Sequence, residues 1–126
     1  MQFGANGEHG QASVELLQWS IARSTDRVSV VLEGEVDLST ADALSNLLAE
    51  VLAERPSKVV VDIAAVSFMD STGIKCFLVA QAAAAITGSC ELVVRRPTPA
   101  VMRIFTICDV AETLLEDLAG DASVAR

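Results

Sequence analysis

The sequence predicts a single α/β domain, with a small mixed β-sheet and helices packed mainly on one side. Strand-like and helix-like segments alternate along the chain, which is typical of parallel strands joined by helical crossovers. Residues 59–63 form an uninterrupted apolar run, as expected for a central strand buried on both faces. The length of 126 residues fits one domain with a substantial core.

The two ends of the chain differ from its middle. Residues 1–12 are rich in small and polar residues and hold the only histidine, His9, so we expect a flexible N-terminal tail. The folded domain is expected over residues 13–118. A polar C-terminal tail is expected over residues 119–126.

Two strands and a helix are expected before the central run. β-branched and apolar residues predict strands over about 14–22 and 28–32. The Ser39 hydroxyl, followed three residues later by Asp42, resembles a capping box and predicts a helix start. The helix should end before Pro56. Its apolar positions recur at helical spacing: Leu44, Leu47, Leu48, Val51 and Leu52.

Two more helices are expected after the central run. The first spans residues 72–87 with Gly88 as its C-cap, and it is apolar nearly all round, so it is buried or meets a partner. A strand follows over 92–94, and then a helix that Thr98 caps. Residues 114–115 are expected to form a short strand or a helical turn. The last main helix carries one apolar stripe: Val101, Ile104, Phe105 and Cys108.

Charge and composition exclude several classes of partner. The formal net charge is −8 and aromatic residues make up only 4%, which argues against nucleic acid and anionic membranes as partners. No signal peptide or membrane-spanning run is apparent. Cys76, Cys90 and Cys108 are too few and too scattered for a disulfide framework. We therefore expect a cytoplasmic protein, as a monomer or weak dimer.

The sequence contains no recognisable catalytic or metal-binding motif. Phosphate-binding loops and closely spaced cysteine pairs are missing, and His9 lies in the expected tail, where it cannot serve as a positioned base. Asp62 and Asp70 are candidates to face one crevice, but acids at strand ends are usually solvated or cap a helix. We expect no catalytic residue and no metal.

The most unusual segment is Asp70-Ser71-Thr72-Gly73, at the expected start of a helix. One interpretation is capping, in which Asp70 or Ser71 satisfies free backbone N–H groups. The other is a phosphoacceptor, because a helix N-terminus exposes a hydroxyl and favours a phosphate. Gly73 is expected to leave the approach to that hydroxyl open. The two interpretations are compatible.

Several segments together resemble a known family. They are Gly-Glu-Val-Asp at 34–37, Thr-Ala at 40–41, Val-Val-Asp-Ile at 60–63 and Ser-Phe-Met-Asp-Ser-Thr-Gly at 67–73, supported by residues 94–105. With these segments the chain resembles the STAS domain of bacterial anti-sigma factor antagonists. The resemblance implies a regulatory protein that is not an enzyme.

The resemblance also implies a phosphorylation switch. An anti-sigma factor kinase would phosphorylate Thr72, with Ser71 as the second choice. The unmodified protein would bind the anti-sigma factor and release the sigma factor, and a Ser/Thr phosphatase would reset it. ATP belongs to the kinase, so no cofactor is implied. The expected partner-binding residues are Asp37, Asp70, Ser71, Thr72, Gly73, Ile74 and Cys76.

Two other functions remain open at this point. A scaffold or accessory STAS protein of a stress-signalling or transport complex would bind partners without a phosphorylation cycle. An enzyme or thiol redox protein would need a reactive cysteine. Cys76 lies one turn after Thr72 and is expected on the exposed docking face, whereas Cys90 and Cys108 are expected to be buried as small apolar residues.

Overall fold

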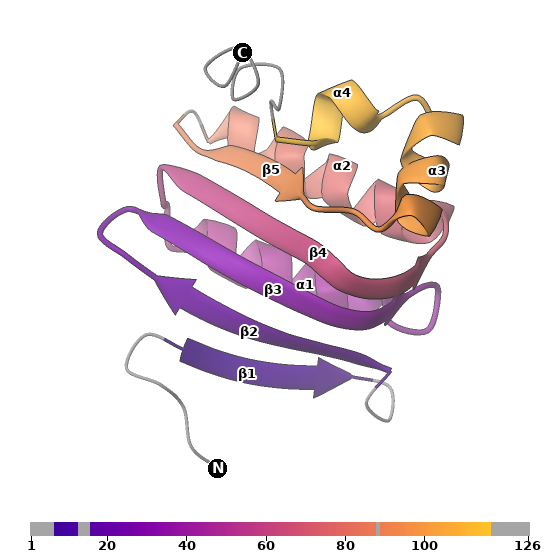
Figure 1. Ribbon diagram of the computed structural model, residues 1–126. Helices are drawn as coiled ribbons and strands as arrows, with labels where there is room; N and C mark the ends of the chain where they lie inside the picture. Colours follow the sequence, from indigo (N-terminus) through magenta and orange to yellow (C-terminus); the bar gives the residue numbers. More distant parts are fainter. Residues whose placement is uncertain (1–6, 13–15, 88, 117–126) are drawn as a thin grey trace, which may run out of the picture.

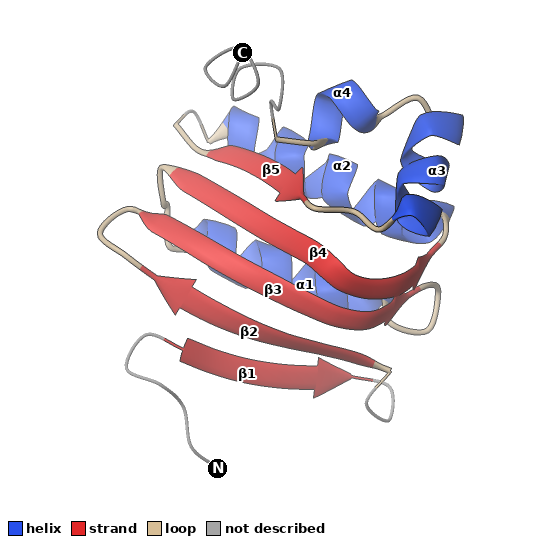
Figure 2. Cartoon of the chain, viewed as in Figure 1, coloured by secondary structure: helices blue, strands red, loops and turns tan. Residues whose placement is uncertain are grey.

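The computed structural model describes residues 7–12, 16–87 and 89–116. In this part of the chain, five strands form one sheet and four helices pack around it (Figures 1 and 2). In chain order the elements are β1 (Gly7–Ala12), β2 (Leu17–Arg23), β3 (Arg27–Val36), α1 (Ala41–Ala53), β4 (Lys58–Met69), α2 (Ser71–Ile86), β5 (Glu91–Arg95), α3 (Pro99–Ile107) and α4 (Ala111–Leu114).

The sheet is mixed, as the sequence predicts. Its strand order is β1-β2-β3-β4-β5, with antiparallel pairs from β1 to β3 and parallel pairs from β3 to β5. The helices α1 and α2 connect the parallel strands and lie side by side on one face, behind the sheet in Figure 1. α3 and α4 lie toward the β5 end. The predicted α/β architecture is confirmed.

The core lies between the sheet and the α1–α2 layer. Alternate residues of β3 and β4 point toward these helices, because side chains alternate along a strand. Val60 faces the other side of the sheet and is still buried, next to Val93. The predicted central strand is β4. It spans Lys58–Met69 and so extends well beyond the apolar run at residues 59–63. The largest fully buried side chains include Leu44, Leu48, Ile63, Phe77 and Phe105.

The start of the chain differs from the expected tail. Residues 7–12 form β1, which pairs with β2 over six residues. An edge strand pairs through backbone atoms on one side only, so it needs no apolar alternation that a sequence could reveal. Gly10 fits this position because a Cβ there would overlap the Trp19 indole ring.

The expected helix caps are only partly correct. Thr40, not Ser39, is the N-cap residue of α1, and its side chain makes no capping hydrogen bond. The Ser39 hydroxyl instead donates to the Asp37 carboxylate, at 2.7 Å. Thr98 caps α3 as predicted, by accepting a hydrogen bond from the Val101 N–H. Gly88 and residues 119–126, for which a cap and a tail were predicted, lie outside the described residues, as does the expected strand start at Val14.

Candidate functional site

The Asp-Ser-Thr-Gly segment lies where β4 ends and α2 begins. Asp70 is the N-cap of α2 in an extended conformation, and its carboxylate accepts a hydrogen bond from the Thr72 N–H at 2.9 Å. The Asp70 N–H donates to the Val36 carbonyl, which ties this turn to the end of β3. The predicted capping role of Asp70 is confirmed.

The two hydroxyl-bearing residues of the segment differ in exposure. Ser71 is exposed and Thr72 is half-buried. Within the described parts of the chain, neither hydroxyl forms a hydrogen bond. The first turn of α2 also presents the positive end of the helix dipole. Ser71 and Thr72 therefore both lie at a helix end that favours an anion.

Gly73 has a different role from the one expected. It is buried, and a Cβ at this position would lie 2.7 Å from both Met69 Cγ and Val36 Cγ1. The glycine allows α2 to pack closely against the ends of β3 and β4. It does not serve to open the approach to the hydroxyls. Ile74, also expected in the docking surface, is buried in the core.

The loop after β3 lies beside this segment, because β3 and β4 are parallel neighbours that end together at Val36 and Met69. In this loop the Asp37 carboxylate accepts hydrogen bonds from the Ser39 hydroxyl and the Ser39 N–H, at 2.7 and 2.9 Å. Buried Thr40 anchors the other end of the loop, with its hydroxyl donating to the Glu35 carbonyl. Asp37 is thereby held at the same edge as Asp70.

These hydrogen bonds favour the charged form of Asp37. The Ser39 hydroxyl contributes most, and the Ser39 and Thr40 N–H groups add to it, so the pKa of Asp37 lies below its usual value despite some desolvation. Asp37 is therefore negatively charged at neutral pH, in the loop that follows β3, the parallel neighbour of β4.

Two exposed apolar side chains flank this edge, and the sequence reasoning missed both. Leu38 is 80% exposed in the loop after β3, and Phe68 is 48% exposed near the end of β4. Exposed apolar groups beside a polar centre often mark an interaction site. Neither residue belongs to a periodic apolar pattern. The only feature of the sequence that could have indicated their exposure is a large apolar residue next to a turn.

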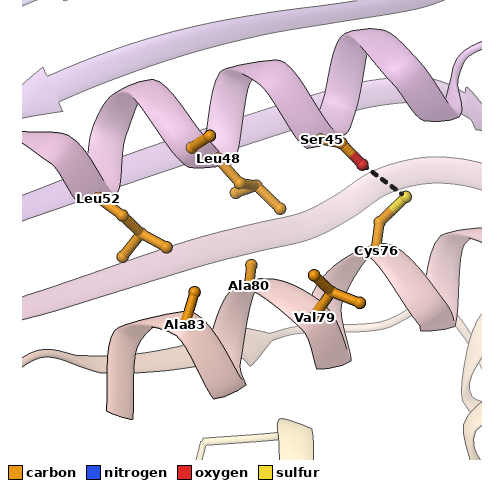
Figure 3. Close-up of a pocket in the computed structure, with 8 residues that line it drawn as sticks. Ser45, Leu48, Leu52, Cys76, Val79, Ala80 and Ala83 are labelled. Atoms are coloured by element: carbon orange, nitrogen blue, oxygen red, sulfur yellow. Dashed lines mark hydrogen bonds between the residues drawn. The ribbon is translucent and has the colours of Figure 1, made fainter. Parts of the chain in front are cut away.

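Cys76 does not lie on the exposed face. It is 8% exposed and points toward α1, where its thiol accepts a hydrogen bond from the Ser45 hydroxyl at 3.3 Å (Figure 3). The thiol also lies 3.7 Å from the Ala41 carbonyl. The expected exposure of Cys76 is therefore wrong, because the neighbouring helix α1 covers this side of α2.

The other two cysteines also differ from expectation. Cys108 is exposed because α3 ends at Ile107 and Cys108 is its C-cap, beyond the buried stripe. Cys90 is half-buried; burial and the nearby Glu91 carboxylate raise the pKa of its thiol. A raised thiol pKa disfavours the reactive thiolate. All three cysteines are free thiols.

Asp62 does not share a crevice with Asp70. Its carboxylate binds the Arg96 guanidinium at 2.7 and 2.9 Å and accepts a hydrogen bond from the Ala64 N–H. Seven residues of β4 lie between the two acids, an extended span of up to about 26 Å at ~3.3 Å per residue. Among the described residues, no group of three or more His, Cys, Asp or Glu side chains could hold a metal ion. No helix in this part of the chain has the length and apolar character needed to cross a membrane.

The chain is similar in sequence to known proteins that contain a STAS domain or act as anti-sigma factor antagonists. The family model described as Mlab, STAS domain matches residues 19–116. Anti-sigma-F factor antagonist RsfB of Mycobacterium tuberculosis is 48% identical over 42 residues. That match covers 33% of this chain and 34% of RsfB, so it spans about a third of the curated relative.

Solved structures extend the likeness over most of the chain. An anti-sigma factor antagonist from Mycobacterium paratuberculosis is 26% identical, with a TM-score of 0.70 over 90% of this chain and 97% of that one. The Bacillus cell fate determinant SpoIIAA in its phosphorylated form is 15% identical, with a TM-score of 0.59 over 84% of this chain and 98% of that one. The second likeness concerns the fold alone.

Proposed function

Because this chain belongs to the STAS domain family, we propose that it acts as an anti-sigma factor antagonist, binding an anti-sigma factor and so freeing a sigma factor. STAS domains of this kind are regulatory binding domains, and the chain is not an enzyme. The observation that carries the proposal is the Asp-Ser-Thr-Gly turn at the start of α2, where Ser71 is exposed and Thr72 is half-buried beside the loop of residues 37–40.

The edge formed by the Asp37 loop and the start of α2 is the proposed docking surface. Asp37, Asp70, Ser71 and Thr72 are at least partly accessible there. Gly73 and Ile74 support this surface from below through their packing in the core. We add Leu38 and Phe68 to the surface as exposed apolar contacts. Acidic and apolar groups side by side suit a partner surface that is basic and apolar.

Phosphorylation of Thr72 by the anti-sigma factor kinase is the proposed switch. A phosphate adds about −1.5 to −2 charge at pH 7. The start of α2 tolerates this charge within the domain, because the helix dipole favours an anion. The partner would instead meet a bulky dianion beside the Asp70 carboxylate. The resemblance in sequence supports Thr72, and the phosphorylated form of SpoIIAA is a precedent within the same fold.

The remaining partners follow from this cycle. The kinase supplies ATP, so this chain needs no cofactor, and a metal-dependent Ser/Thr phosphatase would reset the switch. The three free thiols are compatible with the proposed cytoplasmic location. The net charge of −8 supports protein partners rather than nucleic acid or membrane. The proposed oligomeric state of the chain is a monomer or weak dimer.

Phosphosite mapping tests the proposal. Each anti-sigma factor kinase of the source organism would be incubated with the wild-type chain, Ser71→Ala and Thr72→Ala in the presence of ATP. We expect one kinase to phosphorylate wild type and Ser71→Ala but not Thr72→Ala. Phosphate on Ser71 alone would contradict the assignment of Thr72. Binding to an anti-sigma factor without any phosphorylation would keep the antagonist function and remove the switch, whereas neither phosphorylation by nor binding to any anti-sigma factor would favour the scaffold function.

A further inference from the structure

Lys75 is the only charged residue of α2, and it lies one helical turn after the proposed switch. It follows Ser71 by four positions and Thr72 by three, and residues at these spacings are neighbours on the surface of a helix. Lys75 is exposed, as is Ser71. The flexible side chain of Lys75 therefore lies within reach of a group attached to either hydroxyl.

The positive charge of Lys75 has no counterion in the described parts of the chain. Four other basic side chains form ion pairs with carboxylates there. The side chain of Lys75 forms no ion pair and no hydrogen bond with any described residue. Its ammonium group is therefore available to a new anion at the start of α2.

Carboxylates predominate around the proposed switch. They belong to the cap of α2, the end of β3, the loop after β3 and the first turn of α1: Asp70, Glu35, Asp37 and Asp42. A phosphate placed beside carboxylates is repelled by them, because all these groups carry negative charge at neutral pH. A cation close to Thr72 would offset this repulsion.

The backbone N–H groups at the start of α2 are already largely used. The Thr72 N–H donates to the Asp70 carboxylate at 2.9 Å. The N–H groups of Gly73 and Ile74 donate to the Asp70 carbonyl, at 3.1 and 3.4 Å. An anion at a helix start is held by free N–H groups of this kind. A phosphate would have to displace Asp70 to reach them, so a basic side chain is the more favourable partner.

We propose that Lys75 binds the phosphate on Thr72 and so stabilises the start of α2 in the modified protein. The ammonium group donates charge-assisted hydrogen bonds to the phosphate oxygens. This pairing offsets the repulsion from Asp70 and leaves Asp70 as the cap of the helix. The inference rests on the proposed function, because it takes Thr72 to be the phosphorylated residue.

The pKa of the phosphate itself tests the pairing. Phosphothreonine is introduced at position 72 of the full chain during translation, so no kinase is needed, and ³¹P NMR follows the phosphate as the pH changes. The second pKa of a phosphate is about 6, and a nearby cation lowers it. Lys75→Gln should raise this pKa by about 0.3, whereas Lys75→Arg should leave it low.

Two substitutions that remove the same charge elsewhere serve as controls. Arg55 is exposed and precedes β4, whereas Thr72 follows β4, so Arg55→Gln should change the phosphate pKa by less than about 0.1. Arg103 is exposed on α3, which packs against β4, and it is the alternative cation. A rise in the phosphate pKa with Arg103→Gln but not with Lys75→Gln would overturn the assignment of Lys75.

Thermal unfolding provides a second measurement. Lys75→Gln should lower the midpoint temperature of the phosphorylated chain by about 1–2 °C more than that of the unmodified chain. An unchanged phosphate pKa in Lys75→Gln would overturn the pairing and leave the proposed switch intact. Failure of every kinase to modify Thr72 would refute the switch, even where Lys75→Gln raises the phosphate pKa.

Discussion

At the scale of single residues, Asp70 joins the end of β4 to the start of α2. Its backbone N–H binds the Val36 carbonyl and its carboxylate caps the Thr72 N–H. Asp70→Ala should lower the free energy of unfolding by about 1 kcal/mol, as loss of an N-cap does. Asp70→Asn keeps a capping oxygen and should lose less. Urea unfolding measures both, and an equal loss in the two variants would contradict a capping role.

The pKa of the Asp37 carboxyl group tests the hydrogen bonds that the loop after β3 makes to it. Because hydrogen bonds hold its folded-state pKa below the usual 3.8, its ionised form stabilises the loop above that pH. This contribution disappears as the pH falls through the lowered folded-state pKa. An NMR titration of the Asp37 carboxyl group should therefore show a midpoint below 3.8 in the wild type. Ser39→Ala should move the midpoint back toward 3.8, and an unchanged midpoint would count against the Ser39 hydroxyl as the main cause.

At the scale of elements, close packing of α2 on the strand ends depends on Gly73. Gly73→Ala would place a methyl group 2.7 Å from Met69 and Val36 side-chain atoms. Because overpacking a well-filled core costs about 1–3 kcal/mol, we expect a loss of this size in the free energy of unfolding. Ser71→Ala, in the same turn but exposed, should change it by no more than about 0.5 kcal/mol. Similar stabilities of the two variants would show that the turn relaxes.

Packing of α1 against α2 also controls thiol reactivity. Cys76 is covered by α1, whereas Cys108 is exposed at the end of α3. In native protein an alkylating reagent should modify Cys108 first, and Cys76 should react only after unfolding. Peptide mapping by mass spectrometry would locate the label. Rapid modification of Cys76 in the folded protein would mean that the two helices separate readily.

At the scale of the whole molecule, the sequence predicted the features that leave a repeating pattern. Two such features are the alternation of strands and helices and the apolar run at 59–63. They were enough to predict a mixed sheet with helices on one face, where the structure has α1 and α2. β1 was missed because an edge strand depends on backbone pairing. The burial of Cys76 was missed because it depends on the approach of α1, which local spacing does not encode.

The sequence predicted part of the candidate site, just as it predicted part of the fold. The Asp-Ser-Thr-Gly motif located the helix start and its cap, which the structure confirms. The motif gave no information about Leu38 and Phe68, which lie outside it, in the loop after β3 and near the end of β4. It also did not reveal that Gly73 is required by packing against Val36, which is remote in sequence.

A phosphate on Thr72 is proposed to end partner binding without unfolding the domain. Isothermal titration calorimetry of the anti-sigma factor with the phosphorylated and unphosphorylated chain tests it most directly. We expect affinity to fall more than about a hundredfold, a loss of about 3 kcal/mol, while amide NMR spectra of the two forms differ only near the start of α2. Equal affinities of the two forms, or a phosphorylated form that has lost its tertiary structure, would contradict the claim.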